Sequence, residues 1–473
     1  MVTGGSIPIR DFVAIPTVPP PARFEHEMPR WIATTAREQG PIFRSIWPDG
    51  TIMVYLVGPE ANRFVLHTGR HHFSHAQGWG PILGKLVGKG LLTSDGPDHA
   101  AARAALNPAL SAAYMERYLP VMERVIAART RDWARRRTID LLAELRLIAF
   151  DIAMETLFGV KGGPDVDRLR GLYMALLYPY LQRLESPFAQ PVLLALRARQ
   201  HLRRMVTPLY PIRPYLLPEE DYTPDPALVA EIRQHLVALI AARRAAPEDD
   251  ALGLFLQARD PAAVPFTDEQ LIGQLNTLLV ASHETTTTLG AWLLYLLARH
   301  PTYLARVRDE LDASIGDAAL TIEGLRSLRQ LGRALSEAGR LHPPVGNGPR
   351  GVIADFTFGG YRVPAGVRVR YSIAGCHWSP TIFADPERFD PDRFAMPREE
   401  DKRAPYALIP FGGGPRICPG ANFAQLEIKA LVIHVLRAYD LFPRFGKQPT
   451  QIYAPTLGTP IYGVPVRVRQ RIH

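Results

Sequence analysis

Cysteine, lysine and long hydrophobic runs are all scarce in this chain of 473 residues. Its two cysteines, Cys376 and Cys418, cannot build a disulfide framework, which excludes a small disulfide-stabilised secreted protein and favours a reducing compartment. No apolar run reaches the roughly eighteen residues that a membrane-spanning helix needs, and the proline-rich N-terminus lacks a signal-peptide pattern. We therefore expect a soluble, cytoplasmic protein with no membrane span.

The composition that remains is typical of a globular protein with a large core, because 47% of the residues are hydrophobic and 21% are charged. The formal net charge of +9 comes almost wholly from arginine. A basic balance can serve nucleic acid, a membrane surface or an acidic protein. Since the chain has neither zinc-finger spacing nor an aromatic-and-basic module, we expect no nucleic acid and favour an acidic protein partner.

The chain is organised around the glycine-rich segment FGGGPRICPG at residues 411–420. Three consecutive glycines let the backbone lie flat against a wide planar partner, because glycine has no Cβ and accepts any φ. Pro419 favours the first position of a helix, which makes Cys418 the predicted N-cap. The helix dipole there is expected to lower the pKa of the thiol and favour the thiolate, which is a metal ligand. A buried structural cysteine is the alternative.

This segment resembles the haem-binding signature of the cytochrome P-450 family, position by position from Phe411 to Gly420. The resemblance implies haem b (iron protoporphyrin IX) with Cys418 as the axial iron ligand. It also implies that Phe411, Gly412 and Gly420 lie against the haem and that Arg416 meets one of its anionic groups.

Three more basic residues match positions that bind haem propionates in this family. His99 and Arg103 are four residues apart and project from one face of a predicted helix, where on their own they would be solvated. Arg350 matches the third position. The resemblance implies that all three bind propionates.

A long helix is predicted from Thr267, which forms a capping box with Gln270, to His300, where Pro301 ends the pattern. At 1.5 Å per residue it would be roughly 50 Å long and would cross the molecule. Its middle, ASHETTTT at residues 281–288, is poor helix material, because hydroxyls can bond back to carbonyls and open the helix locally.

Glu284 and Thr285 lie in that middle, between strongly apolar flanks, so we expect both to be buried. A buried acid beside a buried alcohol suggests proton delivery. The two residues resemble the acid–alcohol pair with which the family delivers protons to dioxygen. Ser282 departs from the family, which more often has glycine there.

A charged triad is predicted behind the cysteine segment. Glu337 and Arg340 are i, i+3 on one helix, a spacing common by chance. The later FDPDRF at residues 389–394 is similar to the family's second arginine motif, which implies that Arg393 joins them. Removing one member of such a buried triad would leave an unpaired charge, so we expect loss of haem.

The other predicted elements are local. Residues 172–217 give two core helices with a proline-rich link, and the resemblance implies the mobile lid over the substrate channel. We also predict a hairpin from 42–47 and 51–57, a long functional loop over 67–95, helices over 98–160, short strands at 345–350, 356–363 and 367–373, and a last hairpin from 456–460 and 462–468.

Two further motifs resemble binding sites but predict none. His71 and His75 have i, i+4 spacing for a metal but no third ligand nearby. Residues 80–85, GPILGK, are one residue short of a phosphate loop and lack the following Ser or Thr. Cys376 is expected to be a small core residue.

We predict a mainly α fold with a small β-region, a cytochrome P-450 fold with haem between the long central helix and the cysteine-loop helix. One catalytic domain covers residues 41–473, after an N-terminal extension over residues 1–40. The implied reaction is monooxygenation of an apolar small molecule by O2. Electrons are expected from a separate ferredoxin-type or flavodoxin-type donor with its reductase, and we expect a monomer.

Other functions stay open at this point. A haem-thiolate peroxygenase or isomerase would not need the pair Glu284 and Thr285, and a non-catalytic haem-binding protein is the third possibility. The substrate pocket is expected to be apolar, and its predicted lining is Trp79, Leu91, Leu279, Ala281, Val345 and Leu457.

Overall fold

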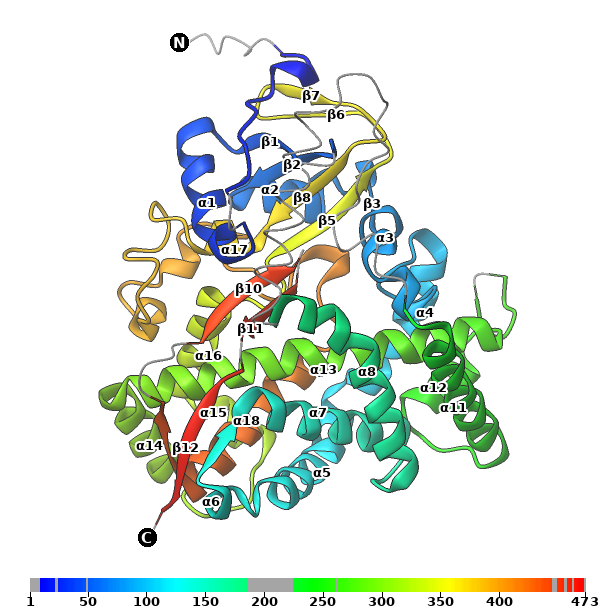
Figure 1. Cartoon of the computed structure of the whole chain (residues 1–473), viewed down its shortest axis with the longest axis vertical. Coiled ribbons are helices and arrows are strands. Elements are labelled where there is room, and N and C mark those ends of the chain that lie inside the picture. Colours follow the sequence, from blue (N-terminus) through cyan, green and yellow to red (C-terminus); the bar gives the residue numbers. More distant parts are fainter. Residues whose placement is uncertain are drawn as a thin grey trace.

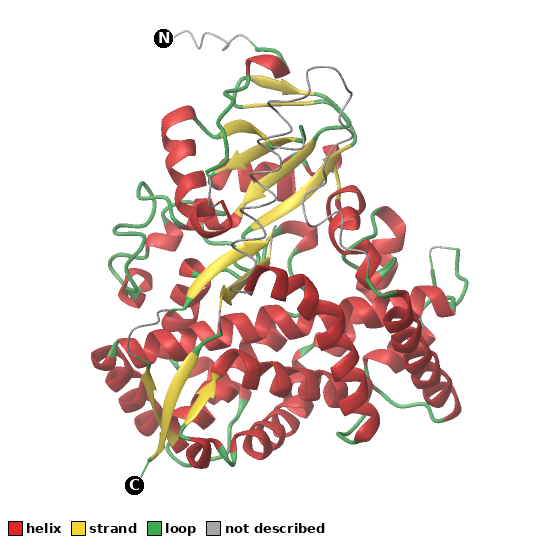
Figure 2. Ribbon diagram, viewed as in Figure 1, coloured by secondary structure: helices red, strands yellow, loops and turns green. Residues whose placement is uncertain are grey.

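The computed structural model describes residues 9–21, 24–47, 50–185, 224–260, 262–444, 449–454, 457–461 and 463–471. The fold is mainly α with small β-sheets, as predicted. In Figure 1 the larger sheet and its covering helices form the upper part of the molecule, and helices fill the lower part. Figure 2 shows the same division in red and yellow.

The described part of the chain forms α-helices along most of its length. They are α1 (Phe24–Gln39), α2 (Pro59–Arg63), α3 (His75–Val87), α4 (Gly96–Leu106), α5 (Ala112–Thr130), α6 (Trp133–Arg136), α7 (Leu141–Phe158), α8 (Pro164–Glu185), α11 (Pro226–Ala245), α12 (Ala251–Gln257), α13 (Asp268–Arg299), α14 (Pro301–Ser314), α15 (Ile322–Ser327), α16 (Arg329–Leu341), α17 (Ile373–His377) and α18 (Ala421–Ala438).

Four sheets complete the described fold. The five-stranded sheet has the order β1-β2-β8-β5-β3, in which β2 and β8 are parallel and the other pairs antiparallel. The others are β4-β12-β9, β10-β11 and β6-β7. The strands are β1 (Ile42–Ile46), β2 (Ile52–Val57), β3 (Phe73–Ser74), β4 (Thr138–Asp140), β5 (Asn347–Val352), β6 (Phe356–Phe358), β7 (Tyr361–Val363), β8 (Arg368–Ser372), β9 (Tyr439–Pro443), β10 (Thr450–Ala454), β11 (Leu457–Ile461) and β12 (Pro465–Gln470).

Helix α13 is the central element of the helical part, and it crosses the molecule in Figure 1. Its N-cap Thr267 and Gln270 form the predicted capping box, and its last residue is Arg299, one before the predicted end. It packs against α7, α16 and α18. The helix is continuous through residues 281–288, so the expected local opening is absent from this described stretch. A rigid central helix of this kind fixes the position of any side chain that it carries.

Three clusters of buried apolar side chains hold the fold together. The largest joins α3, α5, α7, α13 and α18. The second lies on the five-stranded sheet, and the third joins α1 to the same sheet through Met28, Ile32 and Tyr55. Removing this much apolar surface from water is the main stabilising contribution.

Several local predictions are corrected. The segment 67–95 is not one long loop, because α3 occupies most of its middle. Its glycines are typical of loops, but Ser74 caps the helix, because its side chain accepts a hydrogen bond from the amide of Gln77. Gly78 packs so closely on the carbonyl of Pro349 that an added Cβ would lie 2.4 Å from its oxygen. Tertiary packing therefore overrides the weak helix preference of glycine.

The C-terminal hairpin also differs from the prediction. Strand β11 pairs with β10, whereas β12 pairs with β4 and β9. The first hairpin is confirmed, since β1 and β2 pair antiparallel. The predicted lid at 172–217 begins within α8, and its part over residues 186–217 lies outside the described residues. Among the residues that the structure describes, no helix has the length and apolarity that crossing a membrane requires.

Candidate functional site

The cysteine segment forms an irregular loop that leads into α18. The amide of Cys418 donates to the carbonyl of Phe411 at 2.9 Å, which closes the loop. Gly412 and Gly414 have φ of 71° and 60°, and a Cβ on Gly414 would lie 2.1 Å from the carbonyl oxygen of Leu66. Only glycine fits there without a shift. The N-cap of α18 is Gly420, so the prediction of Cys418 at that position is wrong.

The Cys418 side chain is accessible and desolvated at once. The residue is exposed, yet desolvation raises the pKa of its thiol, while the Gly420 amide and Arg103 lower it less strongly. The prediction that the pKa of the Cys418 thiol is lowered is therefore wrong for the protein without a bound cation. Desolvation raises this pKa by more than the nearby helix end lowers it. A residue that is exposed, yet has enough protein around it to desolvate its thiol, leaves room for a bulky partner against the sulfur.

Basic side chains converge beside this loop. Arg103 on α4 donates from Nη1 to the carbonyl of Ile417 at 2.6 Å, which ties it to the residue before Cys418. Arg416 donates to the carbonyl of Ser94 and to Asp95, each at 2.9 Å. Arg350 on β5 is buried and lies over the ring of Tyr371, 5.1 Å from its centroid. Three predicted propionate ligands therefore border one region.

The fourth predicted ligand, His99, belongs to the same cluster. Desolvation, Arg416 and Arg103 lower its pKa to about 4. Desolvation also lowers the pKa of Arg416 to about 10, with Arg350 and Arg103 adding to the effect. Shifts of this sign mean that burial, and after it the neighbouring positive charges, disfavours the charged form of each group. The cluster would be relieved by a bound dianion.

His75 is a member of this cluster that sequence reasoning missed. It is buried, and among the described residues neither ring nitrogen has a hydrogen-bond partner of normal geometry, although the backbone of Leu92 lies near enough to act on its pKa. Its pKa is lowered well below the usual value by desolvation, then by Arg350 and Arg416. The i, i+4 spacing with His71 was the one available signal, and it pointed to a metal. In the structure His71 is exposed and His75 is buried, so the two do not share a site.

The chemistry of this cluster fits the two carboxylates of a porphyrin. Three arginines and two histidines meet a single carboxylate, Asp95, among the described residues that interact with them. An orphaned buried imidazole beside uncompensated guanidinium groups is costly unless an acceptor binds there. The surroundings of the sulfur and the cationic cluster meet at Arg103, so one planar dianionic group can meet both.

The middle of α13 presents two different faces. Ala281, Ser282 and Thr285 are the more accessible residues of this stretch, and Oγ1 of Thr285 donates to the carbonyl of Ala281 at 2.7 Å. Glu284 is buried and points to α7, where Nη2 of Arg146 lies 3.0 Å from its Oε2. The two residues of the predicted pair are neighbours in sequence, but their side chains have different partners. The prediction that both are buried is confirmed for Glu284 and wrong for Thr285, which is partly exposed.

The charge of Glu284 is held by its surroundings. Desolvation alone raises the pKa of this carboxyl, but Arg146 and His283 outweigh it and bring the pKa to about 2. Nδ1 of His283 lies 3.1 Å from Oε1 of Glu284. Arg146 had no sequence signal, because it lies 138 residues away on another helix.

The charged triad lies behind the cysteine loop and has a fourth member. Glu337 bonds Nε of Arg340 at 2.7 Å and Nε of Arg393 at 3.0 Å, and all three side chains are fully buried. Arg393 also binds Glu400 at 2.6 Å. The network therefore holds two acids and two bases, a balance that a buried charge cluster requires.

A chain of contacts joins this network to the cysteine loop. Arg340 donates to the carbonyl of His377 at 2.9 Å. The ring nitrogen Nε2 of His377 accepts from the amide of Ile409, also at 2.9 Å. Ile409 lies two residues before Phe411, so the network fixes the entry of the loop.

The predicted pocket residues fall into two groups. Val345 and Leu457, far apart in sequence, form an isolated antiparallel bridge, and Ala281 is exposed on α13. Trp79, Leu91 and Leu279 are buried members of the large apolar cluster. Leu278, which precedes Ala281 by three positions, is the more accessible neighbour on that helix.

Comparisons with known proteins agree with this arrangement. A family model described as cytochrome P-450 matches residues 21–466. A putative cytochrome P-450 120 of Synechocystis is 31% identical over 405 residues, 85% of this chain and 83% of that protein. A sterol 14alpha-demethylase of Mycolicibacterium vanbaalenii is 28% identical, covering 82% and 81%. The structure of retinoic acid bound cyanobacterial CYP120A1 has a TM-score of 0.78 and 27% identity, covering 98% of this chain and 100% of that one.

Proposed function

Because this chain belongs to the cytochrome P-450 family, we propose that Cys418 is the axial thiolate of its haem b and that the cationic cluster binds the haem propionates. The chain is a haem-thiolate monooxygenase, an oxidoreductase that inserts one atom of O2 into a small molecule with electrons from redox partner proteins. The observation that supports the residue assignment is the accessible but desolvated Cys418, which lies next to Arg103.

The propionate site consists of Arg103, Arg350, Arg416, His99 and His75. Arginine presents fixed pairs of N–H donors that suit carboxylates. The two histidines, neutral without a bound anion, can each donate one N–H. Phe411, Gly412 and Gly420 are the loop residues that lie against the macrocycle.

The polar residues of α13 handle protons. Bound haem supplies dioxygen activation, and the thiolate favours O–O cleavage. Thr285 passes on the proton of its hydroxyl group. The hydroxyl must first break its hydrogen bond to the carbonyl of Ala281. Glu284 supplies protons to this relay from the side of α13 that faces α7. It can take up a proton only when its bond to Arg146 loosens, because that bond holds the carboxylate ionised.

The substrate that we propose is an apolar molecule of the size of a retinoid or sterol. One relative is named as retinoic acid bound and another as a sterol 14alpha-demethylase. A hollow of about 280 Å³ between α3, α8, α11 and α13 has a mixed lining, with Leu86 and Ile232 beside charged residues such as Arg233. None of the predicted pocket residues is among its described lining, so the proposal rests on the relatives alone.

The electron donor that we propose is a ferredoxin-type or flavodoxin-type protein with its reductase, acting on a monomeric enzyme in the cytoplasm. The net charge of +9 supports an acidic donor. Turnover tests the whole assignment. We expect product from a retinoid or sterol panel only with O2, reductant and a donor protein. Equal turnover with peroxide alone would favour the peroxygenase alternative.

A further inference from the structure

A second hollow lies far from the cysteine loop, on the small sheet β4-β12-β9. It has a volume of about 920 Å³, and its walls include Arg137, Phe442, Arg467, Arg469 and Arg471. Helix α18 separates it from the loop, and its 18 residues at 1.5 Å each span roughly 27 Å. The hollow is therefore outside the haem site and needs its own explanation.

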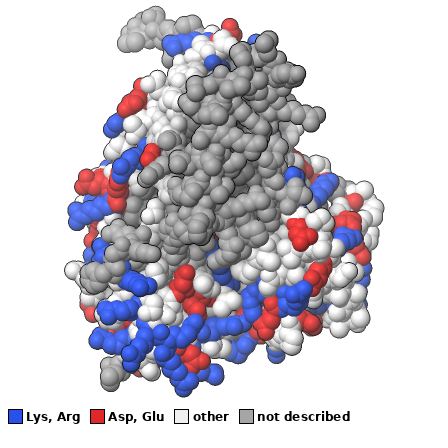
Figure 3. Space-filling view, in the orientation of Figure 1, with Lys and Arg blue, Asp and Glu red and all other residues white. Residues whose placement is uncertain are grey.

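The walls of this hollow carry more positive than negative charge. None of the lining residues that the structure describes is acidic. The nearest acid on β9, Asp440, is already bound by Arg308 and Arg469, each at 2.9 Å. Arg137 and Arg467 form no ion pair within the described part of the chain. Figure 3 shows blue side chains gathered at the lower left, where Figure 1 places β12.

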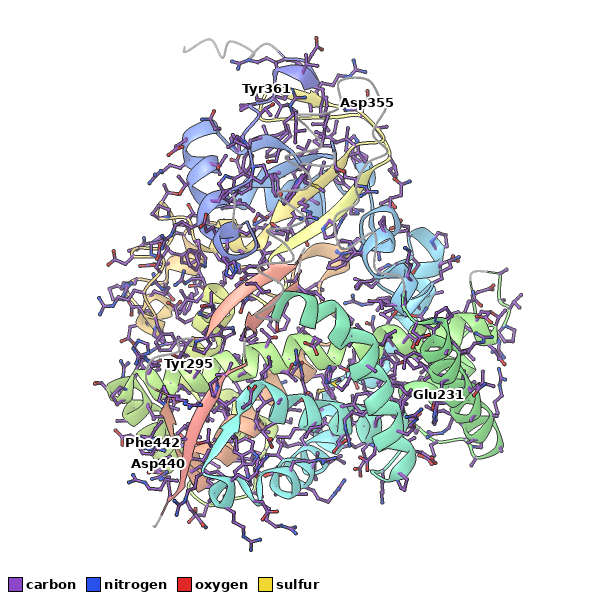
Figure 4. All side chains as sticks on the ribbon, viewed as in Figure 1. Glu231, Tyr295, Asp355, Tyr361, Asp440 and Phe442 are labelled. Atoms are coloured by element: carbon purple, nitrogen blue, oxygen red, sulfur yellow. The ribbon has the colours of Figure 1, made fainter. Side chains whose placement is uncertain are left out.

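Two of these arginines lie over an aromatic ring, which restricts their side chains before any ligand binds. The guanidinium carbons of Arg467 and Arg469 lie 5.7 and 5.1 Å from the ring centroid of Phe442. Asp440 and Phe442, labelled in Figure 4, lie close together on β9 beside this surface. Preorganised donors lose less entropy when they bind.

The backbone at Arg137 is strained. Its φ is 58°, a left-handed conformation that costs a residue with a Cβ roughly 1 kcal/mol or more. Its carbonyl accepts from the amide of Val468 at 2.8 Å, which anchors the turn against β12. Glycine would adopt this conformation freely, so the position carries an arginine at a cost in stability. Strain of this kind often marks a binding position.

We propose that this hollow is a binding site for a phosphate-bearing anion, held by Arg137, Arg467 and Arg471 with Phe442 as its apolar wall. Arginine forks match the paired oxygens of phosphate. A hollow of about 920 Å³ exceeds a single phosphate and suits a phosphorylated organic molecule or a phospholipid headgroup. The two sources share one chemistry and are distinguished below.

The test uses the haem-loaded full chain and two probes. Calorimetry measures binding of inorganic pyrophosphate, and co-sedimentation measures binding to phosphatidylcholine vesicles with and without phosphatidylglycerol. We expect saturable binding of at least one phosphate probe. Binding of pyrophosphate alone assigns the site to a soluble phosphorylated compound, and vesicle binding that requires phosphatidylglycerol assigns it to a headgroup. Binding of neither probe would overturn the proposal.

Variants decide whether the hollow is responsible. Arg467→Gln should weaken binding about tenfold, the loss expected for one charge-assisted hydrogen bond. Arg137→Gly should also weaken binding about tenfold. It should not lower the thermal stability, because glycine removes the backbone strain at this position. Arg135→Gln is the matched control, since Arg135 is 86% exposed and outside the lining. Unchanged binding in the first two variants would overturn the site, and equal binding of polyglutamate would overturn the phosphate class in favour of an acidic protein.

Discussion

Glu284 and Arg146 form a buried ion pair, with Nη2 and Oε2 3.0 Å apart, that joins the centre of α13 to α7. The acid that sequence reasoning placed beside Thr285 for proton delivery is thus held on another side of the helix. Its ionised state is favoured, because its pKa of about 2 lies well below neutral pH. Any proton that it passes must arrive after the pair has loosened.

Arg146→Met tests this pair. It would leave the buried Glu284 with only His283 beside it, so we expect a loss of up to about 3–5 kcal/mol in the free energy of unfolding. Urea unfolding of the haem-loaded protein measures it, and Arg146→Met with Glu284→Leu should recover most of the loss. A single variant as stable as the wild type would show that the pair contributes nothing.

The same pair predicts a dependence on acid. The folded pKa of about 2 is below the usual 4.5. The stability gained from the pair is therefore fully present above about pH 4.5 and is lost as pH falls toward 2. Comparing unfolding of the wild type and Glu284→Gln between these two pH values should show a convergence at low pH. Parallel curves would contradict it.

Thr285→Ala should uncouple electron use from product formation. The variant removes the hydroxyl at Oγ1, so reducing equivalents are expected to appear as peroxide or water while product falls. Measuring NADPH consumed per product formed checks it. Thr285→Ser keeps the hydroxyl and should retain most of the coupling, and unchanged coupling in the alanine variant would remove Thr285 from the relay.

Cys418→Ser should lose the carbon-monoxide spectrum of a thiolate-ligated haem. The chain offers its own control, because Cys376 is buried, and desolvation raises the pKa of its thiol to about 12. Cys376→Ser should therefore keep the spectrum. A thiolate spectrum in the Cys418 variant would mean that the iron ligand is misassigned.

The features that the sequence predicted correctly depend on residues that are close together in the chain or on a recognisable motif. The capping box of Thr267 and Gln270 spans four residues and marks the start of α13. Arg146 and His75 carry no such mark, because Arg146 acts through a partner distant in the chain and His75 through convergence in space. A local sequence pattern cannot predict these contacts, because they form only when the folded elements pack together.

Glycine and proline explain the main error in the predicted secondary structure. Gly78, Gly80, Pro81 and Gly84 suggest a loop, and yet α3 runs through them. Close packing of Gly78 on β5 is available only in the folded chain. The preference of Cys418 for a helix end was likewise a local inference, and desolvation of the sulfur reversed its expected effect on the thiol pKa.

His75 gives the last prediction, a dependence of haem affinity on pH. Without a bound anion His99 has a pKa of about 4 and that of His75 is well below its usual value, so both are neutral at pH 7. Propionates would raise both values, and haem binding would take up protons. Affinity should then be greatest at low pH and decrease as pH rises through the raised values.

The measurement is haem transfer to an apo-globin acceptor, followed from pH 6 to pH 9 with and without substitution. We expect His75→Phe to lose haem about tenfold faster at the lower pH, since one charge-assisted hydrogen bond is worth that much, and to show a flatter pH profile. His71→Phe is the control, because His71 is exposed four residues away. Equal transfer rates for the wild type and His75→Phe at every pH would leave the orphaned imidazole without a role at the propionates.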